Sequence, residues 1–162
     1  MTRSEKEIKF TEMLDENRAL IMRVCYMYAT DKEHLNDLYQ ETAINLWQGM
    51  DSFKGESKRS TWIYRTTLNT CISYFRKNHK HTDTASLEGL MELPDESPDR
   101  AGQLREMYRL ITRLRKLDRA IILLWLDEKS YDEIAEITGF TRNNVASRLH
   151  RIKNQLAELA QE

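Results

Sequence analysis

The stretch SYDEIAEITGFTRNNVASRLHRIKNQL, residues 130–156, has the spacing of two helices joined by a tight turn. Ser130 with Glu133 three residues later forms a capping box, the usual start of a helix. Gly139 suits the left-handed backbone that ends a helix, and Thr141 is a good N-cap for the helix that follows. The order of these signals predicts a helix-turn-helix, and therefore a helical fold for this part of the chain.

The second helix of this motif separates into an apolar and a polar side. The predicted buried residues recur at helical spacing: Val145, Leu149, Ile152 and Leu156. The opposite side carries amide, hydroxyl, imidazole and guanidinium groups, from Asn143, Ser147, His150 and Asn154, flanked by Asn144 and Arg151. Amides, small hydroxyls and arginines are typical readers of base edges and phosphates. A solvated face of an ordinary helical bundle is the alternative interpretation.

The distribution of acidic residues favours nucleic acid over that alternative. Ile137–Ala157 and Ser57–Thr82 contain no Asp or Glu, although acids elsewhere bring the net charge of the 162-residue chain to −1. The second of these windows carries Lys58, Arg59, Arg65, Arg76, Lys77 and Lys80. A nearly neutral chain that excludes acids from two helical segments is expected to present two surfaces to polyanions.

The segment of about Thr61–His79 is predicted to be a helix with a similar division. Its expected core side comprises Tyr64, Leu68, Cys71 and Phe75. The opposite stripe comprises Trp62, Thr66, Asn69, Ser73, Arg76 and Lys80, flanked by Arg65 and Lys77. An exposed Trp62 at the head of a polar and basic stripe would stack on unpaired bases. Alternatively Trp62 packs against the preceding loop, and the stripe is a nucleic-acid face in either case.

Two further helices are expected before this one. Apolar residues recur from about Ile8 to Tyr28, and a second helix covers about Lys32–Met50. The core side of the second helix is predicted to be Leu35, Leu38, Thr42 and Leu46. Its other side carries Asp37, Gln40, Glu41 and Gln48, with Ile44 exposed among them. Because carboxylates repel DNA, this face is expected to contact a protein.

The predicted fold class is all-α, with two small helical domains joined by a flexible linker. The domains are expected at residues 1–81 and 98–162, and the linker, 82–97, is polar to acidic and rich in turn-forming residues. Pro98 is placed to begin a helix whose buried stripe is Leu104, Tyr108, Ile111 and Leu114. Asp118 is then expected to cap a very apolar helix that ends at Leu126.

Several classes of function are not favoured by the sequence. No nucleophile–base pair or phosphate-binding glycine loop suggests catalysis, and we expect no cofactor. His79 and His81 lack companion ligands, so no metal site is expected. Cys25 and Cys71 fall on apolar stripes and are predicted to be buried free thiols in a reducing cytosol. The absence of a secretory signal, and of any apolar run long enough to span a bilayer, favours a cytoplasmic protein without membrane insertion.

Three strings, DLYQETAINLW, SFKGESKRSTWIYRTTLN with FRK, and residues 130–156, occur in the order found in one known family. The chain resembles bacterial RNA polymerase sigma factors, and specifically the extracytoplasmic-function (ECF) group, which keeps only the two DNA-reading domains. The resemblance implies that the protein binds core RNA polymerase and directs promoter-specific initiation. It implies contact with the clamp helices of the largest polymerase subunit through Asp37, Gln40, Glu41, Ile44 and Gln48.

The resemblance also assigns two DNA surfaces. In this family the loop corresponding to about Asp51–Ser60 captures a flipped base of the melted −10 element. The −10 residues implied here are Lys58, Arg59, Trp62, Arg65, Asn69, Ser73, Arg76, Lys77 and Lys80. The implied −35 residues are Arg142, Asn143, Asn144, Ser147, Arg148 and Arg151. Ser73 stands where the family often has Asp, which places the family's usual −10 preference in doubt for this chain.

Further partners follow from the same resemblance. They are the flap region of the polymerase, promoter DNA and, in many relatives, an anti-sigma factor; the free protein is expected to be a monomer. Two other functions are compatible with the pattern: a stand-alone regulator whose first half senses a ligand or dimerises, and a non-enzymatic adaptor that binds only protein. A palindromic operator would identify the regulator, and promoter-dependent transcription would exclude the adaptor.

Overall fold

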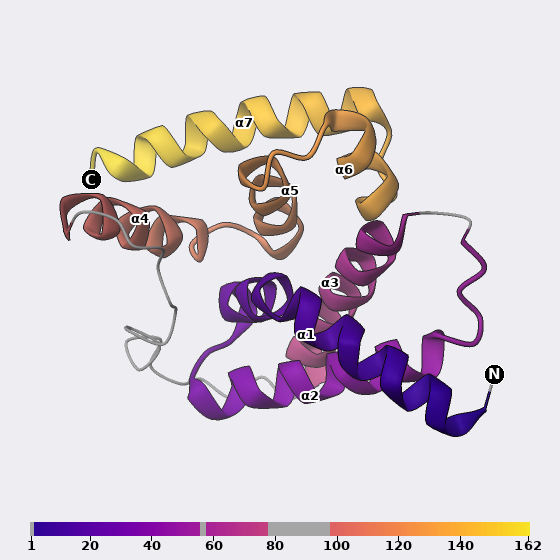
Figure 1. The fold of residues 1–162 in the computed structure, drawn as a ribbon. Coiled ribbons are helices and arrows are strands. Elements are labelled where there is room, and N and C mark those ends of the chain that lie inside the picture. The colour runs from indigo at the N-terminus through magenta and orange to yellow at the C-terminus, as the bar shows by residue number, and fades with distance from the viewer. Residues whose placement is uncertain (1, 56–57, 78–97) are drawn as a thin grey trace. The chain divides into compact units, whose positions relative to one another are not determined.

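Helices form all the regular secondary structure in the part of the chain that is described, which confirms the all-α class (Figure 1). The computed structural model describes residues 2–55, 58–77 and 98–162. The helices are α1 (Arg3–Tyr28), α2 (Lys32–Gly49), α3 (Arg59–Lys77), α4 (Pro98–Ile111), α5 (Lys116–Leu126), α6 (Tyr131–Thr138) and α7 (Arg142–Ala160). The chain divides into two compact units, Met1–Glu88 and Gly89–Glu162. The predicted linker, 82–97, lies outside the described residues, so the domain boundaries stay predictions.

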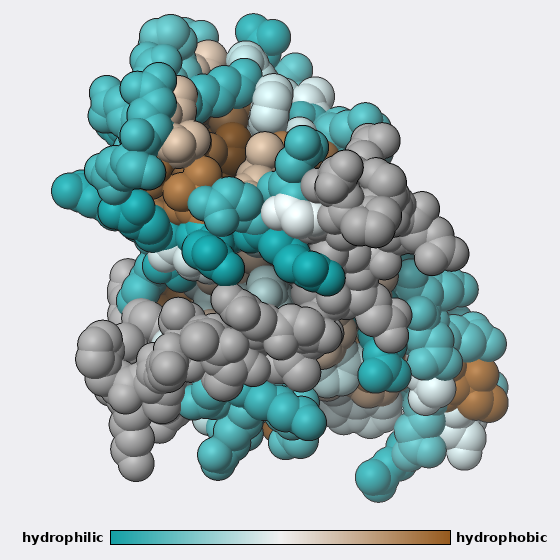
Figure 2. All heavy atoms as spheres, turned by 90° about the vertical axis from the view of Figure 1, so that its left-hand side faces the viewer, coloured by the Kyte–Doolittle hydropathy of each residue, from teal (hydrophilic) through white to brown (hydrophobic). Residues whose placement is uncertain are grey.

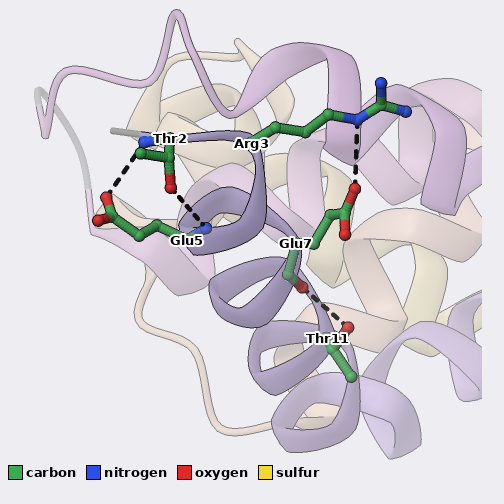
Figure 3. Close-up of polar contacts among 5 residues, drawn as sticks. All are labelled: Thr2, Arg3, Glu5, Glu7 and Thr11. Atoms are coloured by element: carbon green, nitrogen blue, oxygen red, sulfur yellow. Dashed lines mark hydrogen bonds and ion pairs between the residues drawn. The ribbon is translucent and has the colours of Figure 1, made fainter.

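Helix α1 begins earlier than the apolar pattern predicts. Thr2 is its N-cap: the Thr2 hydroxyl accepts from the Glu5 N–H at 3.2 Å, and the Glu5 carboxylate accepts from the Thr2 N–H at 3.1 Å (Figure 3). Arg3 pairs with Glu7 at 3.2 Å on the same turn. These first turns are exposed to solvent, so the capping box determines where the helix starts and the apolar periodicity does not.

The first unit is a bundle in which α1, α2 and α3 each contact the other two. The predicted core side of α2 is confirmed, since Leu35, Leu38, Thr42 and Leu46 are all buried. On α3, Tyr64, Leu68 and Cys71 are buried as predicted, whereas the side chain of Phe75 lies outside the described residues. Thr61, Ile63, Thr67 and Thr70 are buried too, so α3 hides a wider arc of its surface than predicted.

Cys25 of α1 and Cys71 of α3 meet inside this core. Both are free and buried, as predicted, and their Sγ atoms are 3.8 Å apart. Burial, together with the neighbouring Cys25 thiol, raises the pKa of Cys71 well above its usual value. A thiol that resists ionisation is a poor nucleophile, so the pair acts as packing between the two helices.

In the second unit, α5, α6 and α7 contact one another, and α4 packs on α7. The predicted helix-turn-helix signals are confirmed. Ser130 and Glu133 form the capping box of α6, Gly139 ends that helix with φ of 85°, and the Thr141 hydroxyl caps α7 by accepting from the Asn144 N–H at 3.1 Å. The apolar side of α7 is buried at Val145, Leu149 and Ile152, as predicted, whereas Leu156 is only half-buried.

The predicted role of Asp118 is wrong. Helix α5 begins at Lys116, with Arg115 as an N-cap that makes no side-chain hydrogen bond, so Asp118 lies inside the first turn. There it is 6% exposed, and its carboxylate faces two arginines of α7. A buried carboxylate requires a positive partner, and α7 supplies it.

The described surface is largely polar. On the face shown in Figure 2, hydrophilic residues cover most of the described surface, and apolar residues are restricted to small areas. No helix in the described ranges is long and apolar enough to cross a membrane. Within the same ranges, no cluster of His, Cys, Asp and Glu could hold a metal ion; His79 and His81 lie outside them.

Candidate nucleic-acid interfaces and protein-docking face

The outer side of α7 is an exposed polar surface that starts at the turn of the helix-turn-helix. Asn143, Asn144 and Ser147 are exposed in its first two turns, and His150, Arg151 and Asn154 continue it along the helix. The Asn154 amide lies 3.4 Å from Nε2 of His150. Because the buried stripe fixes the rotation of α7, this side must face outward.

Arg148 differs from its neighbours on this surface, since its side chain is only 27% exposed. Its Nε donates to Oδ1 of Asn144 at 2.8 Å, and its guanidinium carbon lies 4.2 Å from the centroid of the Phe140 ring. One terminal nitrogen of Arg148 lies 3.8 Å from Oδ1 of Asp118. The same carboxylate oxygen lies 3.7 Å from a nitrogen of Arg151, whose side chain is 62% exposed. Arg148 is therefore held inside the unit, whereas Arg151 is anchored at its tip and otherwise reaches solvent.

Arg142 belongs to the same end of α7. Its Nε lies 3.2 Å from Oδ1 of Asp132, and both side chains are largely exposed. The guanidinium is also 5.9 Å from the centroid of the Tyr131 ring. An exposed ion pair of this kind contributes little to stability, so Arg142 can exchange Asp132 for a phosphate at small cost.

On α3, Trp62 packs against the preceding loop, which was the alternative interpretation of this residue. It is half-buried, and its ring stacks on Phe53 with centroids 4.9 Å apart and an interplanar angle of 21°. A Cβ on Gly49 would lie 3.2 Å from Cζ2 of Trp62, so the indole lies close against the end of α2. Lys6 of α1 holds the start of the same loop, 3.0 Å from the Asp51 carboxylate. The loop is thus attached to two helices.

The rest of the predicted α3 stripe is partly exposed. Lys58, Arg59, Asn69 and Ser73 are exposed, whereas Arg65 and Thr66 are half-buried. The side chains of Arg76 and Lys77, and all of Lys80, lie outside the described residues. The described part of α3 therefore offers a narrower polar face than α7, with Trp62 at one end as part of the fold.

The outer face of α2 has the predicted character. Ile44 is 49% exposed between exposed Gln40 and Gln48, and Asp37 and Glu41 are half-buried beside them. Tyr74 of α3 lies close to these carboxylates: partial loss of hydration, followed by the charges of Asp37 and Glu41, raises its pKa. An apolar side chain surrounded by amides and carboxylates suits a protein partner better than DNA.

Sequence reasoning missed three residues that shape these surfaces: Asp118, Phe140 and Phe53. A signal for the first was present, because an acid inside the apolar run of α5 needs a cation, and α7, which has no acid before Glu158, is rich in cations. The ring contacts of Phe140 with Arg148 and of Phe53 with Trp62 connect residues on opposite sides of a turn or loop. Helical periodicity carries no information about such contacts.

Comparison with known proteins identifies both units. Residues 13–81 match Sigma-70 region 2, and residues 104–156 match Sigma-70, region 4. RNA polymerase sigma factor YlaC of Bacillus subtilis is 30% identical over 131 residues, which cover 76% of each chain. ECF RNA polymerase sigma factor SigW of the same organism is 28% identical over 168 residues, covering 93% of this chain and 90% of SigW.

A solved structure shows the same fold. The sigma factor RpoE from Bartonella quintana, in complex with the anti-sigma factor NepR, has a TM-score of 0.75 and 22% sequence identity, and the match covers 94% of this chain and 97% of RpoE. The two matched regions and the relatives agree with the resemblance carried by the three sequence strings. The chain belongs to the ECF RNA polymerase sigma factors, non-catalytic proteins of transcription initiation that contain sigma-70 regions 2 and 4.

Proposed function

We propose that this sigma factor reads a −35 element with α7, reads and helps to melt a −10 element with α3 and the loop before it, and binds core polymerase through α2. The observation that carries the proposal is the outer side of α7, which is exposed, carries no acid before Glu158 and begins at a capped helix-turn-helix turn. This arrangement suits insertion of a helix into the major groove with its first turns on base edges. Each good base contact there provides about 1–3 kcal/mol of discrimination.

The −10 part of the proposal rests on α3. Extruding a base from the duplex costs a few kcal/mol, so a site that holds the flipped base increases the population of the open state. The stack of Phe53 on Trp62 and the contact of Lys6 with Asp51 hold the first part of the 51–60 loop against the helices. Asn69 and Ser73 lie exposed farther along α3, where they can follow the separated strand.

The docking part rests on the charge of α2. Asp37 and Glu41 disfavour DNA, and the exposed Ile44 provides an apolar contact at their centre. We assign this face to the clamp helices of the largest polymerase subunit, and we expect the second unit to approach the flap region. The free protein is proposed to be a cytoplasmic monomer, and an anti-sigma factor is a candidate regulator.

Run-off transcription tests the proposal directly. Purified core polymerase is assayed with and without this protein on a library of linear promoters. We expect transcripts from defined start sites that share two spaced upstream elements. Folded protein and competent core that yield no defined start site would overturn the proposal and favour an adaptor that binds only protein.

A variant of α2 separates polymerase binding from DNA reading. Ile44→Asp introduces a charge at the centre of the docking face, so we expect loss of co-purification with core polymerase while the thermal unfolding curve is unchanged. Ile8→Asp is the matched control, because Ile8 is also an exposed isoleucine, 60% accessible, but lies at the start of α1. Equal co-purification of both variants would remove the α2 face from the proposal.

A further inference from the structure

The carboxylate of Asp118, in α5, lies against the part of α7 that contains no acid, residues 142–157. Its side chain is 8% exposed, and a single oxygen, Oδ1, lies 3.8 Å from Arg148 and 3.7 Å from Arg151. Asp118 also occupies the first turn of α5, where the helix N-terminus favours negative charge. Its own helix therefore favours the charge of Asp118, and the two arginines of α7 lie beside it.

Arg148 connects Asp118 to Asn144, because its guanidinium contacts both side chains. The guanidinium has only donors, so the atom of Asn144 that faces Nε of Arg148, at 2.8 Å, must be the amide oxygen. Phe140 lies against the guanidinium at 4.2 Å and restricts its rotation. The backbone of Asn144 is held as well, because its N–H donates to the Thr141 hydroxyl. Both the backbone and the amide oxygen of this exposed residue are thus occupied.

The chemical consequence is a defined orientation of the Asn144 amide. With its oxygen directed at Arg148, its two N–H donors are the groups left for a ligand. In the major groove the matching acceptors are N7 and O6 of guanine, N7 of adenine and O4 of thymine, whereas cytosine offers a donor. An amide that could rotate freely would present either end and discriminate less.

We propose that Asp118 is a positioning residue for DNA reading: through Arg148 it fixes the Asn144 amide so that its N–H groups select a base edge bearing acceptors. This inference rests on the proposed −35 role of α7. Asp118 itself does not touch DNA in this scheme. The anchored Arg151 is held beside the same site, ready for a backbone phosphate.

The test measures discrimination by the full chain with core polymerase at each base pair of its −35 element. Asn144→Ala identifies the base pair that this amide reads, by a loss there of about fivefold or more. Asp118→Asn, which keeps the shape of the side chain and removes its charge, is expected to lower discrimination at that same base pair by about threefold or more. In the double variant, no further loss is expected there, because both changes remove one contact.

Two further variants separate positioning from general effects. Glu162→Gln makes the same charge change in the same unit, at an exposed pair with Arg113, and should leave discrimination unchanged at every base pair. Arg148→Lys, which keeps the charge opposite Asp118 but lacks Nε, should reproduce the loss at the Asn144 base pair. It also serves as the test if Asp118→Asn does not fold.

The outcomes distinguish this inference from the proposed function. A parent protein that senses no upstream base pair refutes the proposed −35 role itself. If the parent protein does sense upstream base pairs, two results would overturn only the positioning role. One is that Asp118→Asn lowers discrimination equally at all base pairs; the other is that its loss adds fully to that of Asn144→Ala. Full discrimination by Arg148→Lys would overturn it as well.

Discussion

Helix α3 and residues 142–157 of α7 share one sequence signature, the absence of acids, but their polar residues are exposed to different extents. On α7 the polar residues Asn143, Asn144 and Ser147 are exposed, and the polar contacts that hold the helix are made at Arg148. On α3, Thr61, Thr67 and Thr70 are buried, and Trp62 is half-buried against a loop. The comparison shows that an acid-free stretch does not by itself tell which of its polar residues are open to a ligand, because packing covers some of them.

The reason lies in which sides of each helix are covered. Helix α3 packs against α1 and α2, and its buried residues lie on more than one side of it, whereas the buried residues of α7 form one stripe. The polar groups that become covered are satisfied locally: the hydroxyls of Thr67 and Thr70 donate to the carbonyls of Ile63 and Thr66 at 2.7 Å. Helix α7 keeps one long side open. Substitutions at equivalent polar positions should therefore affect stability on α3 and recognition on α7.

The largest difference in stability is expected between a truncation of Trp62 on α3 and a truncation on α7. Trp62→Ala removes the stack on Phe53 and the contact beside Gly49, and we expect the first unit to lose about 2–3 kcal/mol of unfolding free energy. Asn143→Ala, a truncation at an exposed position of α7, should change stability by less than about 0.5 kcal/mol. Urea unfolding followed by circular dichroism measures both. Equal unfolding free energies of the two variants would mean that Trp62 contributes no more to stability than Asn143 does.

The next largest difference in stability is expected at the turns that precede α3 and α7. Gly139, with φ of 85°, joins two capped helices, and Gly55, with φ of 73°, lies in the longer loop before α3. An added Cβ meets nothing within 4 Å at either position, so only the backbone conformation is tested. We expect Gly139→Ala to cost about 1–2 kcal/mol. Gly55→Ala should cost less, because a longer loop can redistribute the strain; the reverse order in thermal unfolding would contradict this.

A third test uses the buried threonines of α3. Thr70 accepts a hydrogen bond from the Asn45 amide of α2 at 2.8 Å, so Thr70→Val should cost about 1 kcal/mol. The Thr67 hydroxyl donates to the Ile63 carbonyl within its own helix, and Thr67→Val should change stability by less than about 0.5 kcal/mol. Both variants should select the same promoters as the parent. A changed promoter preference in either would show that buried groups of α3 also influence recognition.

Local rules account for the parts of this structure that the sequence predicts. Ser130, Gly139 and Thr141 end or begin helices through contacts within three or four residues, so their roles follow from spacing. The buried side of α2 follows from helical periodicity. The pairing of Asp118 with α7 could not be predicted in the same way, because it depends on how two helices cross. The sequence allowed two interpretations of Trp62 for a similar reason: its neighbour Phe53 lies in a loop, and helical spacing does not predict contacts with a loop.

Arg151 provides the smallest expected change in stability and the clearest separation of stability from recognition. Its side chain is 62% exposed, and Asp118 keeps Arg148 as a partner when Arg151 is removed. Arg151→Ala should therefore change unfolding free energy by less than about 0.5 kcal/mol. If Arg151 contacts one phosphate, the slope of log K against log salt for promoter binding by the holoenzyme should become shallower by about 0.9. An unchanged slope with unchanged stability would assign Arg151 to neither role, and the polar face of α7 would then end before this residue.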